Sequence, residues 1–262
     1  MVDRNNFDRI WLTLGAKDLR YTKFEHSPLR ESAGIRDSIK LALKEAVVDH
    51  HKHSGEVAGL LEKHGFRKAS QILSSQLPRN HNTRMGNFGE VVSSEHLRQR
   101  YGYAMPVFKL RFAENFQMSP RGEDIIGFEM NDKNQILSIC LGEAKTLGTY
   151  KISAVEEAHE RLANAFNPFP VSLSLIASVL SEREDTYLAN QVQEIMARLA
   201  SKPFPRRNWI FIICGHEPQT PFDAIEIKRQ IVKNLSCVDV YLQDLQDLVR
   251  EIFDAPLTRK RR

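Results

Sequence analysis

Cysteine is scarce in this sequence, with three residues among 262, at Cys140, Cys214 and Cys237. Their odd number and wide spacing, each in or beside an apolar run, argue against a disulfide framework and predict reduced core thiols. The chain also lacks any run of roughly 20 apolar residues that would cross a membrane. Its polar N-terminus lacks the apolar stretch of a signal peptide. We therefore expect a cytoplasmic protein with no membrane contact.

A strong charge of either sign is absent as well. Lysine and arginine number 37 and aspartate and glutamate 33, so the formal net charge is +4. Such a mild balance permits contact with a polyanion without requiring it. Hydrophobic residues make up 42% and charged residues 27%, which is ordinary globular composition and excludes a wholly disordered or fibrous chain.

Helical periodicity dominates the first third of the chain. One apolar pattern of this kind spans residues 29–49, and a second runs from Val57 to Phe66. The polar stretch at residues 77–82 then interrupts the periodicity. We predict three parts: a helical N-terminal lobe, a main domain and a basic tail, at residues 1–82, 83–256 and 257–262.

The main domain opens with a helix and then changes to the periodicity of strands. Residues 84–101 have one apolar helical face, on which Gly86 and Gly89 would allow close approach to a sheet, and Thr83 is placed to cap the helix. Three strands are predicted next, joined by a turn between the last two. These strands are expected at residues 107–112, 125–130 and 136–141.

Helices and strands alternate through the remainder of the chain. Ser153 and Glu156 form a capping-box pattern that opens a helix. The apolar periodicity then predicts two helices, two strands and an amphipathic closing helix. Their expected positions are residues 172–200 for the helix pair, 209–214 and 238–242 for the strands, and 245–253 for the last helix. The fold class is α/β, with a mixed sheet flanked by helices and a helical N-terminal lobe.

Three acids and a lysine are candidates for a common site: Glu90 on the first helix of the main domain, Asp124 at the start of one strand, and Glu143 and Lys145 at the end of the next. Side chains two residues apart on a strand share a face, so the last two should project together. These four residues are the framework of the predicted site.

The hairpin register decides which acid faces Glu143. A turn symmetric about residues 132 and 133 places Asp124 opposite Leu141 and diagonal to Glu143, on the same face. A bulge in the hairpin would shift the register by one residue and bring Glu123 to that face instead.

Carboxylates gathered on one face repel each other unless a cation neutralises them. Hard oxygen ligands with open water positions suit Mg²⁺ or Mn²⁺. Such an ion lowers the pKa of a bound water and stabilises charge on a phosphoryl oxygen, which is the chemistry that phosphodiester hydrolysis needs. Lys145 would orient that water and counter negative charge in the transition state; proton abstraction by Lys145 requires a depressed pKa.

The Glu-x-Lys pattern alone is weakly specific, and the chain contains it twice. Glu226 and Lys228 form the second copy, in a segment of helical periodicity with no preceding hairpin, and we interpret them as surface charge. Glu143 and Lys145 differ because they close an apolar strand, where two charges would otherwise be poorly placed.

As a set, these residues resemble the PD-(D/E)XK nuclease superfamily, through the segments at 122–128 and 142–145 with Gly89 and Glu90 before them. The resemblance implies a restriction-endonuclease-like core. It also implies that Asp124, Glu143 and the backbone carbonyl of Ala144 bind the metal while Lys145 assists the nucleophilic water.

Two details of this resemblance are less regular. Glu90 matches a helix glutamate that joins the metal site in many members, although Glu95 lies close by. The proline that gives the superfamily its name is absent, because Glu123 precedes Asp124.

More narrowly, the layout is similar to the HamA family, the small nuclease subunits of the Hachiman anti-phage defence system, whose partner is the superfamily 2 helicase HamB. This resemblance implies DNA as the substrate and a helicase partner that controls activity. Two alternatives remain open. One is a non-catalytic nucleic-acid-binding adaptor subunit, and the other is an RNA-directed nuclease with the same metal site.

Several weaker signals have simpler explanations. His50, His51 and His53 are expected at a polar helix end rather than in a zinc site. His159, on the helix after the site, could approach the phosphate, but we interpret it as a surface histidine. The basic tail at residues 259–262 could contact phosphate, although most such charges are simply solvated. Five further basic residues could line a path toward the site: Arg84, Arg98, Arg100, Lys109 and Arg111.

Overall fold

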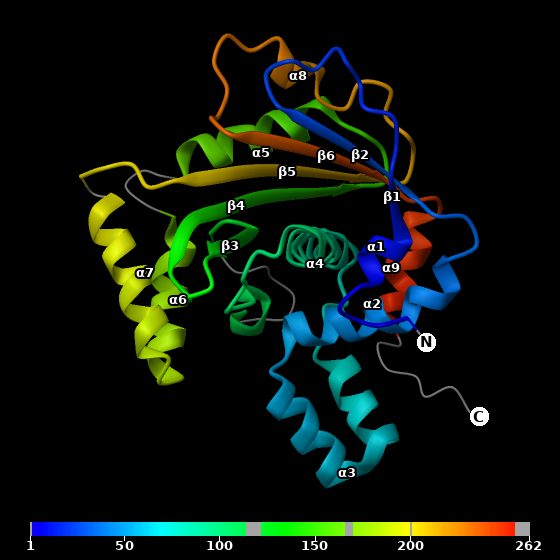
Figure 1. The fold of residues 1–262 in the computed structure, drawn as a ribbon. Coiled ribbons are helices and arrows are strands. Elements are labelled where there is room, and N and C mark those ends of the chain that lie inside the picture. Colours follow the sequence, from blue (N-terminus) through cyan, green and yellow to red (C-terminus); the bar gives the residue numbers. More distant parts are fainter. Residues whose placement is uncertain (1, 114–121, 166–169, 200, 255–262) are drawn as a thin grey trace.

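The computed structural model describes residues 2–113, 122–165, 170–199 and 201–254. Six strands form one sheet in the order β1-β2-β6-β5-β4-β3 (Figure 1). The four inner strands are parallel, and the two edge strands pair antiparallel. The strands are β1 (Leu12–Leu14), β2 (Glu25–Glu31), β3 (Ile125–Met130), β4 (Ile136–Leu147), β5 (Arg206–Cys214) and β6 (Leu235–Tyr241). The predicted mixed sheet is therefore confirmed.

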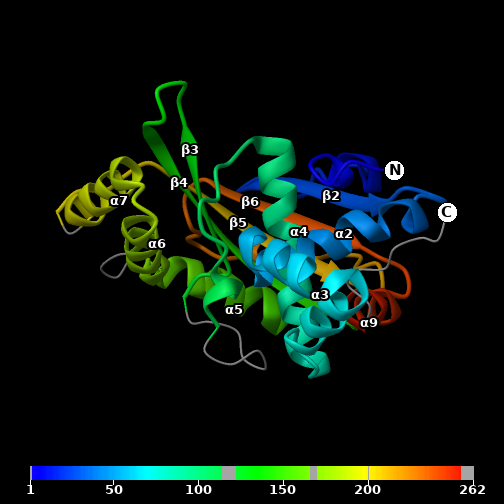
Figure 2. The same ribbon diagram turned by 90° about the horizontal axis from the view of Figure 1, so that it is seen from below.

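Helices cover both faces of this sheet (Figures 1 and 2). They are α1 (Phe7–Trp11), α2 (Arg36–His51), α3 (Ser54–Ser75), α4 (His81–Tyr101), the 3₁₀ helix η1 (Lys109–Phe112), α5 (Ile152–Asn164), α6 (Val171–Glu182), α7 (Thr186–Leu199), α8 (Asp223–Glu226) and α9 (Leu245–Asp254). No helix among these described residues is long and apolar enough to cross a membrane.

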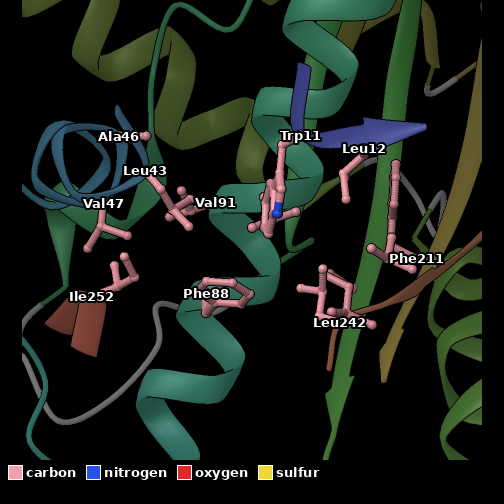
Figure 3. Close-up of a cluster of buried hydrophobic side chains, with 14 of the residues drawn as sticks. Trp11, Leu12, Leu43, Ala46, Val47, Phe88, Val91, Phe211, Leu242 and Ile252 are labelled. Carbon is pink, nitrogen blue, oxygen red and sulfur yellow. The ribbon is translucent and has the colours of Figure 1, made fainter. Parts of the chain in front are cut away.

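The core has two parts, one for each face of the sheet. On one side, α2, α4 and α9 contribute apolar side chains against the strands, and Figure 3 shows Phe88 and Val91 of α4 among them. On the other side, α5 packs against β4 and β5, α6 packs against α7, and the apolar residues of all three helices belong to one buried cluster with the strands. The three cysteines are free and buried, as the sequence predicts.

The N-terminal region contributes strands as well as helices, which corrects the prediction of a purely helical lobe. Residues 29–31 end strand β2, and helix α2 begins only at Arg36. Strand β2 pairs with β6, which lies about 200 residues later in the chain. One sheet therefore crosses the boundary predicted at residue 82. Local periodicity missed β2 because its sequence, EHSPLRE, is mostly polar.

Helix α3, which we call the α3 finger, projects from this body (Figure 1). It consists of two helical halves that meet at Gly65, whose φ of 70° lies in the left-handed region that favours glycine. Of its 22 residues, Ala69 and Leu73 are the buried ones. The finger is therefore held mainly at its base.

Helix α4 confirms the predicted helix at residues 84–101 and lies against the sheet. Its N-cap is Asn80, whose side chain accepts hydrogen bonds from the backbone N–H groups of Asn82 and Thr83, so the predicted cap at Thr83 is wrong. A Cβ on Gly89 would lie 2.1 Å from Thr146 Oγ1, whereas one on Gly86 would meet nothing within 4 Å. Close approach to the sheet is thus confirmed for Gly89 and wrong for Gly86.

The strand predicted at residues 107–112 is also wrong, because this segment ends in the 3₁₀ helix η1. The Phe108 ring stacks on His50 with 3.7 Å between ring centroids, and Arg111 Nη2 lies 3.3 Å from Asp49 Oδ1. These contacts hold the segment against the end of α2 rather than in the sheet. Helix α5 likewise starts at Ile152, so Ser153 lies inside its first turn and does not cap it.

Candidate active site

The hairpin of β3 and β4 brings Asp124 and Glu143 together. Ile125 pairs with Gly142 and Ile126 with Leu141, so continuing the register by one residue sets Asp124 opposite Glu143. The predicted pairing of Asp124 with Leu141 is off by two residues. One residue comes from the turn, because Met130 pairs with Ile136 and not with Gln135, and the other from the register shift between Glu129 and Met130. A shift of two residues preserves the face, and the expectation that both acids share it is confirmed.

Asp124 is fixed by the backbone of β4, while its neighbour Glu123 points elsewhere. Asp124 Oδ2 accepts a hydrogen bond of 3.0 Å from the Ala144 N–H group. Glu123 is buried and accepts hydrogen bonds from the N–H groups of Val171 and Ser172, at 3.2 and 3.0 Å. Glu123 therefore satisfies the first turn of α6, and Asp124 is the acid that faces Glu143.

Glu143 is deeply buried beside a second carboxylate. Burial raises the pKa of Glu143 to about 8, and the negative charge of Asp124 adds to this shift. Its Oε2 atom lies 3.2 Å from Arg161 Nη1 on α5. Nevertheless, Oε2 accepts no hydrogen bond from any part of the chain that the structure describes. Among the described residues, Glu143 Oε2 is thus a buried oxygen without the hydrogen-bond donor that buried acceptors normally have.

Glu90 enters the same cluster from α4. Burial raises the pKa of Glu90 to about 8. The Lys109 ammonium lies 3.7 Å from Glu90 Oε2 and 3.7 Å from Asp124 Oδ1, so one cation contacts both acids. Glu95 faces away from the site, where it pairs with His50 and Arg98. Of the two helix glutamates, the structure brings Glu90 to the acids.

Lys145 follows Glu143 by two residues on β4, and its ammonium is held by α5. Lys145 Nζ donates a hydrogen bond of 2.8 Å to Glu157 Oε1. Its side chain is 16% exposed and borders the cleft beside the acids. The predicted common face of Glu143 and Lys145 is therefore accessible to a ligand from the Lys145 side.

A cleft of about 710 Å³ opens onto this cluster. Helix α4 forms one wall and the end of β4, with the loop after it, forms the other. Among the lining residues are Glu90, Asp124, Ala144, Lys145, Arg161 and the first residues of α4, His81 and Asn82. Glu143 lines a neighbouring cavity of about 420 Å³, and Arg161 borders both spaces.

A divalent cation fits the paired carboxylates of Asp124 and Glu143. Their oxygens are the hard ligands that Mg²⁺ and Mn²⁺ prefer, and the unbonded Glu143 Oε2 is a ready donor. Within the described ranges, however, no group of three or more His, Cys, Asp or Glu side chains is arranged to hold a metal. The candidate metal site therefore consists of two carboxylates. Glu90 contacts Lys109 and is not placed to bind the ion directly.

Two cations at the site, Lys109 and Arg161, contact the acids in a way that the sequence does not predict. Lys109 was grouped with a general basic path and placed in a strand, and Arg161 was not singled out. A signal for Arg161 exists, since it lies four residues after Glu157 and hence on the same side of α5 as the partner of Lys145. The pairing of Lys145 with Glu157 is evident only from the fold.

The remaining basic candidates have structural roles. Arg84 pairs with Asp254, Arg98 with Glu95, Arg100 with Asp8 and Arg111 with Asp49. The predicted path of basic side chains is therefore wrong for these four arginines, and Lys109 is buried against Glu90 and Asp124. The tail at residues 257–262 lies outside the described residues.

The histidines and the second Glu-x-Lys pair are likewise accounted for by packing. His50 and His51 end α2 as predicted but are buried, whereas His53 is exposed. His159 is buried rather than a surface residue, and its Nε2 accepts a hydrogen bond from the Val232 N–H group. Glu226 binds Thr22, remote from the acids, as expected of surface charge.

Comparison with known proteins identifies the family of this chain. The family model described as HamA matches residues 8–255, which is nearly the whole chain. The Hachiman protein HamA of Bacillus cereus is 28% identical over 194 residues, covering 72% of this chain and 69% of that protein. The matched segment includes every candidate site residue. The chain therefore belongs to the HamA family.

Proposed function

We propose that this protein is a metal-dependent DNA nuclease of the PD-(D/E)XK type, acting as the effector subunit of a Hachiman anti-phage defence complex. The observation that carries the proposal is the direct juxtaposition of Asp124 and Glu143 on the β3–β4 hairpin, with Lys145 two residues further on. Membership in the HamA family supports the defence role. A restriction-endonuclease-like core is part of the same proposal.

The residues of the cleft have distinct tasks in this proposal. Asp124, Glu143 and the backbone carbonyl of Ala144 would hold Mg²⁺ or Mn²⁺, with Glu90 adding negative charge nearby. When bound, such an ion supplies a water of lowered pKa and stabilises charge on a phosphoryl oxygen. Lys145 orients the attacking water and counters negative charge on the phosphate.

Arg161 is suited to hold the substrate in this cleft. Its side chain is 42% exposed and borders the cleft, so the guanidinium is open to solvent on one side. A guanidinium binds a phosphate through two parallel hydrogen bonds. In the absence of substrate, the same group lies 3.2 Å from Glu143 Oε2. We therefore assign Arg161 the role of binding a phosphate next to the one that is cleaved.

The partner in this proposal is a helicase of the HamB type that controls the nuclease. The name of the Bacillus cereus relative assigns that protein to the Hachiman system. The N-terminal region, residues 1–82, is the candidate contact surface for the helicase. Any test of that contact must keep β1 and β2, because both strands belong to the central sheet.

The deciding experiment is degradation of plasmid and linear DNA by the purified protein in Mg²⁺, alone and with a HamB-type helicase plus ATP. The double variant Glu143→Ala/Lys145→Ala should lose at least about 100-fold in cleavage rate. Glu226→Ala/Lys228→Ala is the matched control, since it removes the other Glu-x-Lys pair outside the cleft. That control should cut like the wild type, and chelation should stop both.

Other outcomes select the alternatives. If the wild type binds DNA but cuts nothing even with the helicase, the chain is an adaptor subunit. If it cleaves matched RNA strands but not DNA, the proposed metal-dependent mechanism is retained and the substrate is RNA. Equal cutting by the wild type and Glu143→Ala/Lys145→Ala would refute the assigned site.

A further inference from the structure

The α3 finger carries a concentration of positive charge at its tip. Lys63 and His64 end the first half, Gly65 makes the bend, and Arg67 and Lys68 begin the second half. Lys63, Arg67 and Lys68 are exposed and form no ion pair with any described residue. Glu62 is the one acid beside them in sequence, so the tip has an excess of positive charge.

Four of the arginines elsewhere in the molecule are neutralised instead. Arg84, Arg98, Arg100 and Arg111 are each paired with a carboxylate of the same chain. Like charges placed close together repel and offer no stability to the folded chain. The unpaired charge at the tip is therefore available to an external anion.

The apolar residues of the finger indicate which kind of anion. Along Ser54–Ser75 the exposed large hydrophobic side chain is Phe66, at 37%, directly between the basic residues of the tip. Leu60, Leu61 and Ile72 are half-buried. A helix that docks on a protein presents an apolar stripe, and protein interfaces are depleted of lysine. An aromatic ring among basic groups is instead typical of a nucleic-acid surface.

The position of the finger relative to the cleft points to the same ligand. His81 and Asn82, which line the cleft, follow the finger after a short connection. Each half of the finger has about ten residues and is about 15 Å long at the rise of an α-helix. Since one strand of duplex DNA advances 3.4 Å per base, the tip reaches about four base pairs beyond the finger's base.

We propose that the tip of the α3 finger binds the backbone of the DNA whose phosphodiester is held in the cleft, through Lys63, Arg67 and Lys68, with Phe66 packing against sugar or an exposed base. This inference rests on the proposed function, since it takes DNA as the substrate. The proposed contact lies outside the cleft, on the α3 finger, which buries only Ala69 and Leu73 of its own residues.

DNA binding without cleavage tests this directly. Full-length protein carrying Glu143→Ala is titrated against a fluorescent duplex and a fluorescent single strand of the same sequence, in metal-free buffer at several salt concentrations. Adding Lys63→Ala/Arg67→Ala/Lys68→Ala should weaken binding at least about 10-fold. It should also lower the slope of log K against log salt by about two to three, since each phosphate contact contributes about 0.9.

A matched control removes the same charge elsewhere. Lys202, Arg229 and Lys233 are exposed residues that precede β5 and β6 and have no ion pair among the described residues. Lys202→Ala/Arg229→Ala/Lys233→Ala should leave the affinity within about twofold and the salt slope nearly unchanged. Phe66→Ala should weaken single-strand binding more than duplex binding, because bases stack on an aromatic ring only when unpaired.

Three results would overturn the inference: equal losses in the finger and control variants, an unchanged salt slope in the finger variant, or no DNA binding by the parent protein. Loss of helicase binding with unchanged DNA binding would assign the tip to an acidic protein surface instead. Cleavage is scored separately with Glu143 restored. A finger-dependent affinity without any cleavage would refute the nuclease proposal and leave this contact standing.

Discussion

Two adjacent acids, Glu123 and Asp124, have opposite roles because neighbouring residues of an extended chain point to opposite faces. Asp124 faces Glu143 and is held by the Ala144 N–H group, whereas Glu123 accepts hydrogen bonds from the start of α6. The hairpin register therefore places one acid in the proposed metal site and the adjacent acid in a structural role.

Exchanging these acids for their amides should separate activity from stability. Asp124→Asn should reduce cleavage at least about 100-fold, because it removes a charged ligand, while thermal unfolding changes little. Glu123→Gln should cut DNA normally and lose about 1 kcal/mol of stability, because a neutral amide caps α6 less well. Initial rates in Mg²⁺ and thermal unfolding measure both. A similar loss of activity in the two variants would contradict the register argument.

The buried carboxyls Glu90 and Glu143 should make the metal-free protein less stable as pH rises. Both have a pKa of about 8 in the folded chain, against 4.5 ordinarily. Between these values the folded state keeps protons that the unfolded state releases, so the free energy of unfolding falls as pH rises from about 4.5 to 8. Each carboxyl contributes a slope of up to about 1.4 kcal/mol per pH unit.

Urea unfolding at several pH values in chelator measures this slope. Glu90→Gln and Glu143→Gln should each flatten the decline between pH 5 and 8, because the amide has no proton to lose. Glu160→Gln, at an exposed position on α5, is the control and should follow the wild type. Identical slopes in all four proteins would show that neither buried carboxyl titrates in this range.

At the scale of secondary-structure elements, the close approach of α4 to β4 sets the position of Glu90. Gly89 lies against Thr146, which is on the same strand as Glu143 and Lys145. Glu90 follows Gly89 directly, so the distance of the helix from the sheet fixes how deeply this carboxyl enters the acid cluster.

Alanine at the two glycines of α4 should have opposite effects. Gly89→Ala requires Thr146 to rotate or α4 to shift, and should cost about 1–3 kcal/mol as an overpacked contact. Gly86→Ala meets nothing and should be neutral or stabilise by up to about 1 kcal/mol through helix propensity. Chemical denaturation of both variants measures this, and a stable Gly89→Ala protein would contradict the close approach.

At the scale of the whole molecule, the N-terminal segment is part of the core and the α3 finger is not. Phe7, Trp11 and Leu29 are almost fully buried, and β2 covers the edge of β6. The finger, in contrast, buries only Ala69 and Leu73. A protein cut at the boundary expected from local periodicity would lose two strands of its sheet.

Two deletions distinguish these parts. Removing residues 2–31 should abolish cooperative thermal unfolding, because the core loses large side chains and β6 loses its neighbour. Replacing Ser54–Ser75 by a short glycine-serine linker should lower the melting temperature by only a few degrees, since little apolar surface is involved. A folded protein without residues 2–31 would refute this assignment of the core.

The sequence by itself determined the elements whose signal is local. The strands around residues 125–130, 136–141 and 209–214 and the closing helix were found because their apolar periods are long and regular. The shared face of Asp124 and Glu143 was found because strand side chains alternate with a period of two. A register error of two residues therefore leaves both side chains on the same face.

Only the tertiary structure decided the features that depend on residues far apart in the chain. Strand β2 exists because β6 offers it a hydrogen-bonding edge, and η1 replaces a strand because Phe108 and Arg111 contact the end of α2. The cations Lys109 and Arg161 reach the acids from separate elements. No local pattern encodes such encounters, since they depend on how the helices pack against the sheet and not on the period of any one segment.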